Sequence, residues 1–185
     1  MIPLQLKKLI QMTERPILIT GAAGFIGSHL SRALKTQGNE IVCIDNLNDY
    51  YSPSLKLHRF NSILDGQVKL VNGDIKNSTF LGKIFRESQP KLVIHLAAQA
   101  GVRLPIKEFS KYIDANIFGH IEIFRHCVET QLIPIIYASS SSVYGDTEVS
   151  ILSEDLLNLA PTSFYGLTKK WGEEYAKLVS KRYGL

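Results

Sequence analysis

The sequence predicts an α/β protein built on a doubly wound parallel sheet. Five short apolar runs lack the alternation of half-buried strands, and segments of helical periodicity alternate with them. Strands and helices that alternate in this way indicate βαβ units with helices on both faces of the sheet. A length of 185 residues suits one such domain.

Each expected strand is a run rich in Val, Ile or Leu. Such runs suit parallel strands, because both faces of the sheet are covered and neither needs polar residues. The third run, residues 68–74, is the weakest indication of a strand. The expected strands are residues 16–20, 40–45, 68–74, 91–97 and 133–139.

The expected helices are marked by apolar residues three or four positions apart. The first has Ile26, Leu30 and Leu34 in one row and Gly38 as its stop. The long connection at 145–160 has a length typical of functional or mobile loops. The other rows are Leu81, Ile84 and Phe85; Ile113, Ile117, Ile121 and Phe124; and Leu167, Trp171, Tyr175 and Leu178, in a helix from near Thr162 or Ser163 to Gly184.

Composition and charge argue against several classes of function. The net charge is +4, but Lys and Arg are scattered rather than clustered, so we expect no nucleic-acid partner. No stretch is apolar enough for a membrane span, so we expect no membrane partner. Cys43 and Cys127 lie in apolar segments without a CxxC pattern, which indicates reduced thiols in a cytoplasmic protein. His95, His120 and His126 lack metal-ligand spacing, so we expect satisfied structural histidines and no metal.

The stretch PILITGAAGFIGSHL joins the first strand to the first helix through three glycines. Gly21 permits a sharp turn, Gly24 leaves room for a pyrophosphate, and Gly27 permits close packing of the helix. Free N–H groups and the dipole at the start of that helix favour an anion. The spacing GxxGxxG is a variant of the dinucleotide-binding pattern, and a tight turn without a ligand is the alternative.

An acidic residue ends the second strand, where a dinucleotide ribose is read. Asp45 follows Gly27 by 18 residues, and its carboxylate is able to accept hydrogen bonds from both ribose hydroxyls. It would repel a 2′-phosphate, and the next residues, NLND, offer no Arg or Lys to bind one. We therefore expect NAD rather than NADP; a solvated Asp at a strand end is the alternative. Asp74 follows the third strand, within reach of an adenine amino group.

Two motifs downstream combine the groups of a proton-transfer site. YASSSSVYG, residues 137–145, follows the last strand at the sheet end where α/β proteins bind ligands. Tyr165 and Lys169 are four residues apart and share a helix face. A Lys ammonium and a positive nicotinamide would lower the pKa of the phenol, and a serine would relay its proton. An ordinary amphipathic helix is the alternative for the Tyr–Lys pair.

Seven motifs follow one another along the chain: ITGAAGFIGSHL, IDNLNDYY, GDI, HLAAQAGVR, DANIFG, YASSSSVYG and FYGLTKK. They resemble the extended short-chain dehydrogenase/reductases, the family of NAD-dependent epimerases and dehydratases of nucleotide sugars. The resemblance runs from about Pro16 to the last residue. It implies a Rossmann fold with NAD as cofactor. Within the family, NLNDYY, AAQAGVR and ASSSSVYG are most similar to UDP-glucuronate 4-epimerases.

The resemblance implies a role for each matching residue. Ser141 and Ser142 stand where the dehydratases have Asp and Glu, which favours an epimerase. Arg103, Ser141 and Ser142 are candidates for substrate contact, an exposed loop Arg being the alternative for Arg103. The implied catalytic residues are Ser140, Tyr165 and Lys169, and the implied cofactor contacts are Gly21, Gly24, Phe25, Ile26 and Gly27 at the pyrophosphate, Asp45 and Asn46 at the ribose, Asp74 and Ile75 at adenine, Ala97, Ala98 and Gln99 on the path to nicotinamide, and Asn116, Tyr165 and Lys169.

The implied reaction is epimerisation at C4 of a nucleotide-sugar substrate of the UDP-glucuronate or UDP-glucose type. Tyr165 takes the proton of the C4 hydroxyl, with Ser140 on the same oxygen, while hydride passes to NAD. The planar 4-ketone turns over, and hydride returns to its opposite face. Because NAD ends the cycle as it began, tight retention of the cofactor would serve the reaction.

We expect residues 14–185 to form the NAD-binding domain, after a loose N-terminal extension at 1–13. The family continues into a region that grips the nucleotide sugar, so we expect a C-terminally truncated Rossmann fold without the substrate-binding domain. Two alternatives stay open: an NAD-binding domain without turnover, and a sugar-nucleotide reductase or dehydratase. The family also implies a homodimer through the helices at 113–128 and 162–182.

Overall fold

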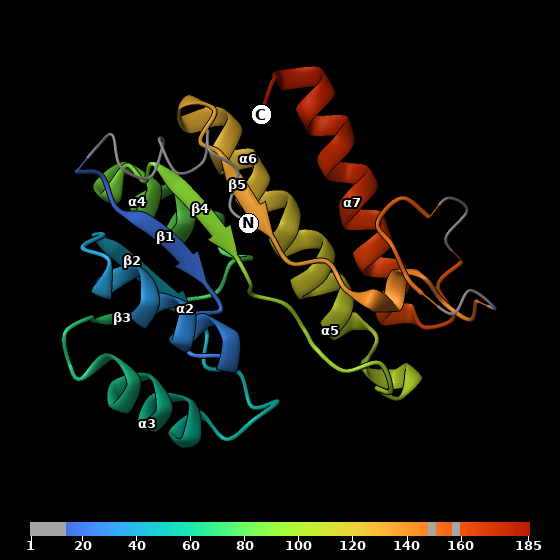
Figure 1. Ribbon diagram of the computed structural model, residues 1–185, viewed down its shortest axis with the longest axis horizontal. Helices are drawn as coiled ribbons and strands as arrows, with labels where there is room; N and C mark the ends of the chain where they lie inside the picture. The colour runs from blue at the N-terminus through green and yellow to red at the C-terminus, as the bar shows by residue number, and fades with distance from the viewer. Residues whose placement is uncertain (1–13, 148–150, 157–159) are drawn as a thin grey trace.

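Five parallel strands form one sheet in the order β3-β2-β1-β4-β5 (Figure 1). The computed structural model describes residues 14–147, 151–156 and 160–185, so the predicted extension at 1–13 lies outside the described residues. Ile17 lies opposite Ile41 on one side and Leu92 on the other. The fold class and all five predicted strands are confirmed. The strands are β1 Ile17–Thr20, β2 Ile41–Asp45, β3 Leu70–Asn72, β4 Leu92–His95 and β5 Ile135–Tyr137.

Helices cover both faces of this sheet (Figure 1). Alternate residues of β1 point to opposite faces: Ile17 and Ile19 pack with residues of α2 and α3, whereas Leu18 packs with residues of α4 and α6. The sheet therefore separates two hydrophobic cores. The helical elements are α2 Phe25–Thr36, α3 Pro53–Leu64, α4 Ser78–Ser88, η1 Ile106–Glu108, α5 Ser110–Tyr112, η2 Ile113–Gly119, α6 His120–Gln131, η3 Ser141–Val143 and α7 Phe164–Tyr183.

The buried face of helix α2 consists mostly of small residues. Ile26 is 65% exposed, while the small residues Gly27 and Ser31 are buried. The Ser31 hydroxyl donates to the Gly27 carbonyl at 2.7 Å, which satisfies it inside the core. Small residues on the buried face allow the helix to approach β1 and the glycine turn closely. Leu34 lies in the core and Ile26 does not, so the apolar row indicates the helix without defining its buried face.

The helix predicted around 113–124 is interrupted by a π-helical segment. The segment η2 lies between the short α5 and α6, and it turns Asn116 into the interior. Ile113 and Ile117, which the predicted row would bury, are only half-buried. A π-turn holds one more residue than an α-turn, so it shifts the register of every side chain that follows.

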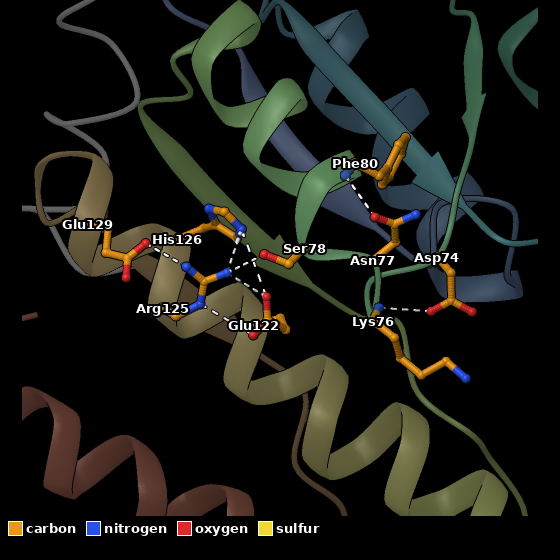
Figure 2. A network of polar contacts seen from close by, with 9 residues as sticks. All are labelled: Asp74, Lys76, Asn77, Ser78, Phe80, Glu122, Arg125, His126 and Glu129. Carbon is orange, nitrogen blue, oxygen red and sulfur yellow. Dashed lines mark hydrogen bonds and ion pairs between the residues drawn. The ribbon is translucent and has the colours of Figure 1, made fainter.

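A polar network fixes the end of α4 nearest the site (Figure 2). The Asn77 side chain caps α4 by accepting from the Phe80 N–H at 3.0 Å. Arg125 of α6 donates to the Ser78 hydroxyl at 2.5 Å and forms ion pairs with Glu122 and Glu129. The connection that follows β3 is thereby attached to α6. None of the helices in the described part of the chain has the length and apolar character needed to cross a membrane.

Candidate active site

The glycine turn after β1 is packed so closely that two of its glycines admit no side chain. Gly21 has a φ of +69°, and a Cβ there would lie 2.7 Å from the backbone nitrogen of Ala97. A Cβ at Gly27 would lie 2.2 Å from the Gly21 carbonyl oxygen. A Cβ at Gly24 would meet only that carbonyl, at 3.1 Å, among the described residues. Gly24 therefore borders open space, as room for a pyrophosphate requires.

The start of α2 differs from the starts of the other long helices near the site. Side chains of Ser52 and Ser163 cap α3 and α7, but Gly24 provides no side-chain cap to α2. Phe25 and Ile26, the first residues of α2, are 69% and 65% exposed. The first N–H groups of α2 therefore have no side-chain cap, and uncapped N–H groups at a helix start favour an anion.

Asp45 links the glycine turn to the end of β2. One oxygen of its buried carboxylate accepts from the Ala23 N–H at 3.1 Å, and the other accepts from the Leu47 N–H at 2.8 Å. Each oxygen has a second lone pair for a ligand hydroxyl. Asp45 therefore has a structural role, holding the turn, beside the predicted contact with a ribose.

The two residues predicted beside adenine differ in what they expose. Asp74 is half-buried and accepts from the Asn46 side chain at 3.1 Å, so the ends of β2 and β3 are joined. The Ile75 side chain lies in the core, where a Cβ at Gly119 would come within 2.4 Å of it. Of these two residues, Asp74 is therefore the one with exposed surface for a ligand, because Ile75 as a whole is buried.

Lys56 is a cation near Asp45 that the sequence analysis did not include. It is 6% exposed, and its ammonium donates to the carbonyl oxygen and the side-chain oxygen of Asn48 at 2.9 and 2.7 Å. Burial lowers its pKa, while the charges of Asp45 and Asp49 oppose that shift. The four residues that follow Asp45 contain no base, whereas α3 brings this one back from further along the chain. Its bonds to Asn48 commit it to the loop.

The loop after β4 forms one wall of the site and is held by Asn116. The Ala97 N–H donates to the Thr20 hydroxyl at 3.1 Å. The Gln99 N–H donates to the Asn116 side-chain oxygen at 2.8 Å, and the Asn116 amide donates to the Gln99 carbonyl at 3.2 Å and to the Thr168 hydroxyl at 3.1 Å. Asn116 thus joins this loop to α7, which the family role alone did not indicate.

Tyr165 and Lys169 come together at the end of β5, as predicted. The Lys169 ammonium lies 5.8 Å from the Tyr165 ring centroid and donates to the Ala138 carbonyl at 2.9 Å. Burial lowers the pKa of Lys169 to about 8. Burial also raises the pKa of Tyr165, and a hydrogen bond from Ser140 opposes that rise. The groups of the chain alone do not offset the burial. The predicted lowering of the Tyr165 pKa also requires the charge of a bound nicotinamide, so it stays a prediction.

The serine cluster leads from β5 towards α7. Ser140 caps the start of the short helix η3, and its side-chain oxygen accepts from the Ser142 N–H at 3.2 Å. Ser141 is exposed and Ser142 is half-buried. A Cβ at Gly166 would come within 2.4 Å of the Ser142 carbonyl oxygen, so η3 packs directly on the helix that carries Tyr165. Arg103 lies on the exposed part of the loop after β4, without a hydrogen bond or ion pair to the residues described.

Two buried histidines lie behind Lys169. His95 shares a 2.7 Å hydrogen bond with the Thr20 hydroxyl, as a satisfied structural histidine should. His120, by contrast, is 6% exposed, and its Nε2 has no partner among the described residues, so the prediction of a satisfied role is wrong there. With Ala98 and Lys169 they border a cavity of about 10 Å³. Burial, and then the Lys169 charge, lower the pKa of His120 to about 4, which keeps it neutral.

Comparisons with known proteins agree with this geometry. Residues 17–185 match the family described as "NAD dependent epimerase/dehydratase family". UDP-glucuronate 4-epimerase 3 of Arabidopsis thaliana is 44% identical over 171 residues, covering 91% of this chain and 40% of its own length. Protein CapI of Staphylococcus aureus is also 44% identical, over 91% of this chain and 51% of its own.

No group of three or more metal-ligating side chains gathers in the described part of the chain.

Solved structures give the same result. The UDP-glucuronic acid 4-epimerase of Bacillus cereus, in complex with UDP-glucuronic acid and NAD, superposes with a TM-score of 0.82 at 36% identity, over 92% of this chain and 54% of that one. The UDP-glucose 4-epimerase of Thermus thermophilus, in complex with NAD, gives 0.80 at 27% identity, over 92% and 52%. The chain spans about half the length of the relatives it matches.

Proposed function

The chain belongs to the NAD-dependent epimerase/dehydratase family, and on that premise we propose that it is the cofactor-binding part of a UDP-sugar 4-epimerase. The observation that carries the proposal is the meeting of Tyr165, Lys169 and Ser140 at the same sheet end as the glycine turn. UDP-glucuronate is the substrate we propose, because five relatives named UDP-glucuronate 4-epimerase are 41–44% identical to this chain. A nucleotide sugar is the partner we propose for the whole protein.

NAD is the cofactor we propose, because the residues present fit it. The open side of Gly24 and the uncapped start of α2 suit a pyrophosphate. The Asp45 carboxylate suits an adenosine ribose and disfavours a 2′-phosphate. Lys169 and Tyr165 lie where the nicotinamide end of the dinucleotide would reach. The wall formed by residues 97–99 leads from the glycine turn to them.

When bound, NAD would supply an acceptor and donor for the C4 hydride. Tyr165 would take the proton of the C4 hydroxyl at its own oxygen and later return it. Ser140, whose hydrogen bond already favours the phenolate, would donate to the same sugar oxygen. The Lys169 ammonium is fixed by the Ala138 carbonyl and places a positive charge beside the phenol.

Two alternatives predict different measurements. A reductase would show a net change in NADH with each turnover, whereas an epimerase would not. A chain that only binds NAD would show neither product nor net change. Dehydratases of the family have Asp and Glu at the positions of Ser141 and Ser142. The segment η3 therefore lacks the acid that a dehydratase needs to eliminate water, which argues against that activity.

The proposal is tested by incubating the chain with NAD and UDP-glucuronate and resolving UDP-galacturonate by chromatography. We expect NAD binding but turnover near background, because orientation of a substrate supplies on the order of 7–11 kcal/mol of a barrier and half of each relative lies outside the match. Absence of NAD binding would overturn the proposal. Robust turnover that Tyr165→Phe abolishes and Tyr183→Phe preserves would show that the 185-residue chain is itself a complete catalyst.

We also propose that the chain forms the homodimer that its family resemblance implies. Phe118 on η2 and Leu167 and Leu178 on α7 expose 60%, 52% and 61% of their surface, on the helices expected to pair. Light scattering should return twice the chain mass, and Leu178→Glu should return a monomer. Lys177→Glu, a charge change on the neighbouring residue, is the control. A wild-type monomer would contradict the proposal.

A cytoplasmic location, based on two free and buried cysteines, stays a prediction.

A further inference from the structure

Two loops from opposite sides of the glycine turn touch each other. Because β1 lies between β2 and β4, the loops that follow β2 and β4 flank the turn that follows β1. Tyr50 belongs to the first of these loops and Gly101 to the second. A Cβ at Gly101 would lie 2.3 Å from the Tyr50 hydroxyl oxygen and 3.2 Å from its ring. The Tyr50 side chain therefore occupies the space that any larger residue at 101 would need.

Both sides of this contact are anchored. On the β4 side, the Tyr112 hydroxyl donates to the Gly101 carbonyl, and the Tyr112 side chain is buried. On the β2 side, the buried Lys56 holds Asn48, and the Tyr50 ring packs edge-on against Tyr51 at 4.8 Å between centroids. The contact thus joins two loops that are each fixed independently.

The tip of the first loop also reaches the catalytic end of the site. The Tyr50 phenol lies near enough to Tyr165 and Tyr112 to contribute to the raised pKa of both. Its own hydroxyl has no hydrogen bond to the described residues, and its side chain is 38% exposed. Residues 46–50 therefore run from the ribose-binding end at Asp45 to the neighbourhood of Tyr165.

We infer that Tyr50 is a positioning residue that closes the loop after β2 over a bound dinucleotide and slows its release. This inference rests on the proposed NAD site. A dinucleotide on the glycine turn, with its adenosine at Asp45 and its other end at Tyr165, must cross the line between the two loops. The contact of Tyr50 with Gly101 would then have to break before the dinucleotide leaves.

The test measures NADH release rather than turnover. The chain is loaded with NADH, mixed with excess NAD, and the decay of bound NADH fluorescence is followed. Loss of one aromatic contact should accelerate release about five- to tenfold in Tyr50→Ala. Tyr50→Phe retains the ring and should stay within about twofold of the wild type. Tyr183→Ala, which removes a half-exposed tyrosine at the end of α7, should leave release unchanged.

A second variant separates the contact from general damage to the loop. Gly101→Ala should displace Tyr50 and accelerate release, although its φ of +89° strains Ala as well. If the contact is the cause, the double variant Tyr50→Ala/Gly101→Ala will release NADH no faster than the faster single variant. Additive effects, or unchanged release in Tyr50→Ala with normal affinity, would overturn the inference. Failure of the wild type to bind NADH would overturn the proposed function, and this inference with it.

Discussion

The two halves of the site are held in different ways. In the half around Gly21, β1 is fully buried at the centre of the sheet, and backbone atoms fill the space beside the glycines. In the half around Tyr165, β5 is the edge of the sheet, and Ile136 on it is 39% exposed. There the geometry depends on side-chain contacts, such as the hydrogen bond that the Lys169 ammonium donates to the Ala138 carbonyl.

This difference indicates a division of labour. A phosphate-binding turn made of backbone has one conformation, so it recognises a group that every dinucleotide shares. A proton-transfer site made of side chains can have its pKa values adjusted residue by residue. Substitutions in the first half should therefore act on folding and binding together, and substitutions in the second should separate them.

The largest effect on folding is expected from Gly27→Ala. The added Cβ would lie 2.2 Å from the Gly21 carbonyl oxygen, and backbone must move to admit it. Overpacking of this kind costs about 1–3 kcal/mol of unfolding free energy. Urea denaturation and NAD titration should show both losses together. Gly82→Ala, inside α4, is the matched control. Its Cβ would lie 3.3 Å from the flexible end of the Arg86 side chain and 3.4 Å from the His126 ring, with no backbone atom of the described residues in the way, so stability should change much less than in Gly27→Ala. Unchanged stability in Gly27→Ala would contradict the close packing.

Asp45→Ala should weaken NAD binding by roughly ten- to a hundredfold, because charge-assisted hydrogen bonds contribute about 1.5–3 kcal/mol. The same change removes an acceptor from the Ala23 N–H, so stability should also fall. Calorimetric titration measures the affinity, and NADP serves as the comparison ligand. Equal affinity of the wild type for NAD and NADP would contradict the assigned role of the carboxylate.

Lys169→Met should separate stability from function in the other half. The pKa of Lys169 is lowered to about 8 in the folded chain, against about 10.4 in the unfolded one. Below pH 8 the Lys169 ammonium is charged in both the folded and the unfolded chain. Burying this charge in the folded chain destabilises the fold. As pH rises from 8 towards 10, the folded state loses its proton first, so the unfolding free energy rises.

The variant should therefore be more stable at pH 7, by about 1–3 kcal/mol, and should lack this rise. Denaturation at a series of pH values measures both effects. Lys181→Met changes an exposed lysine on the same helix and should retain the wild-type profile. If the unfolding free energy of Lys169→Met changes with pH in the same way as that of the wild type, burial of this ammonium does not destabilise the fold.

The sequence was sufficient for the strands, the glycine turn and the proximity of Tyr165 to Lys169, because each depends on residues close together in the chain. It was not sufficient where three-dimensional packing decides. The apolar row of α2 indicates the helix but not its buried face, because the helix presents small residues to the turn. Lys56 is brought back towards Asp45 by α3, and Tyr50 reaches Gly101 through a loop conformation that no local pattern encodes. His120 was predicted to be satisfied, yet its Nε2 has no partner among the described residues.

The π-helical segment η2 also bears on how this chain would tolerate a change of length. Deleting one residue between 113 and 119 would let α5 continue into α6 as an ordinary helix, because the wide turn already contains one residue more than an α-turn. The flanking helices would stay in phase, but Asn116 would rotate away from Gln99 and Thr168. A one-residue gap here would leave the scaffold intact while detaching the wall of the site from the helix that carries Tyr165.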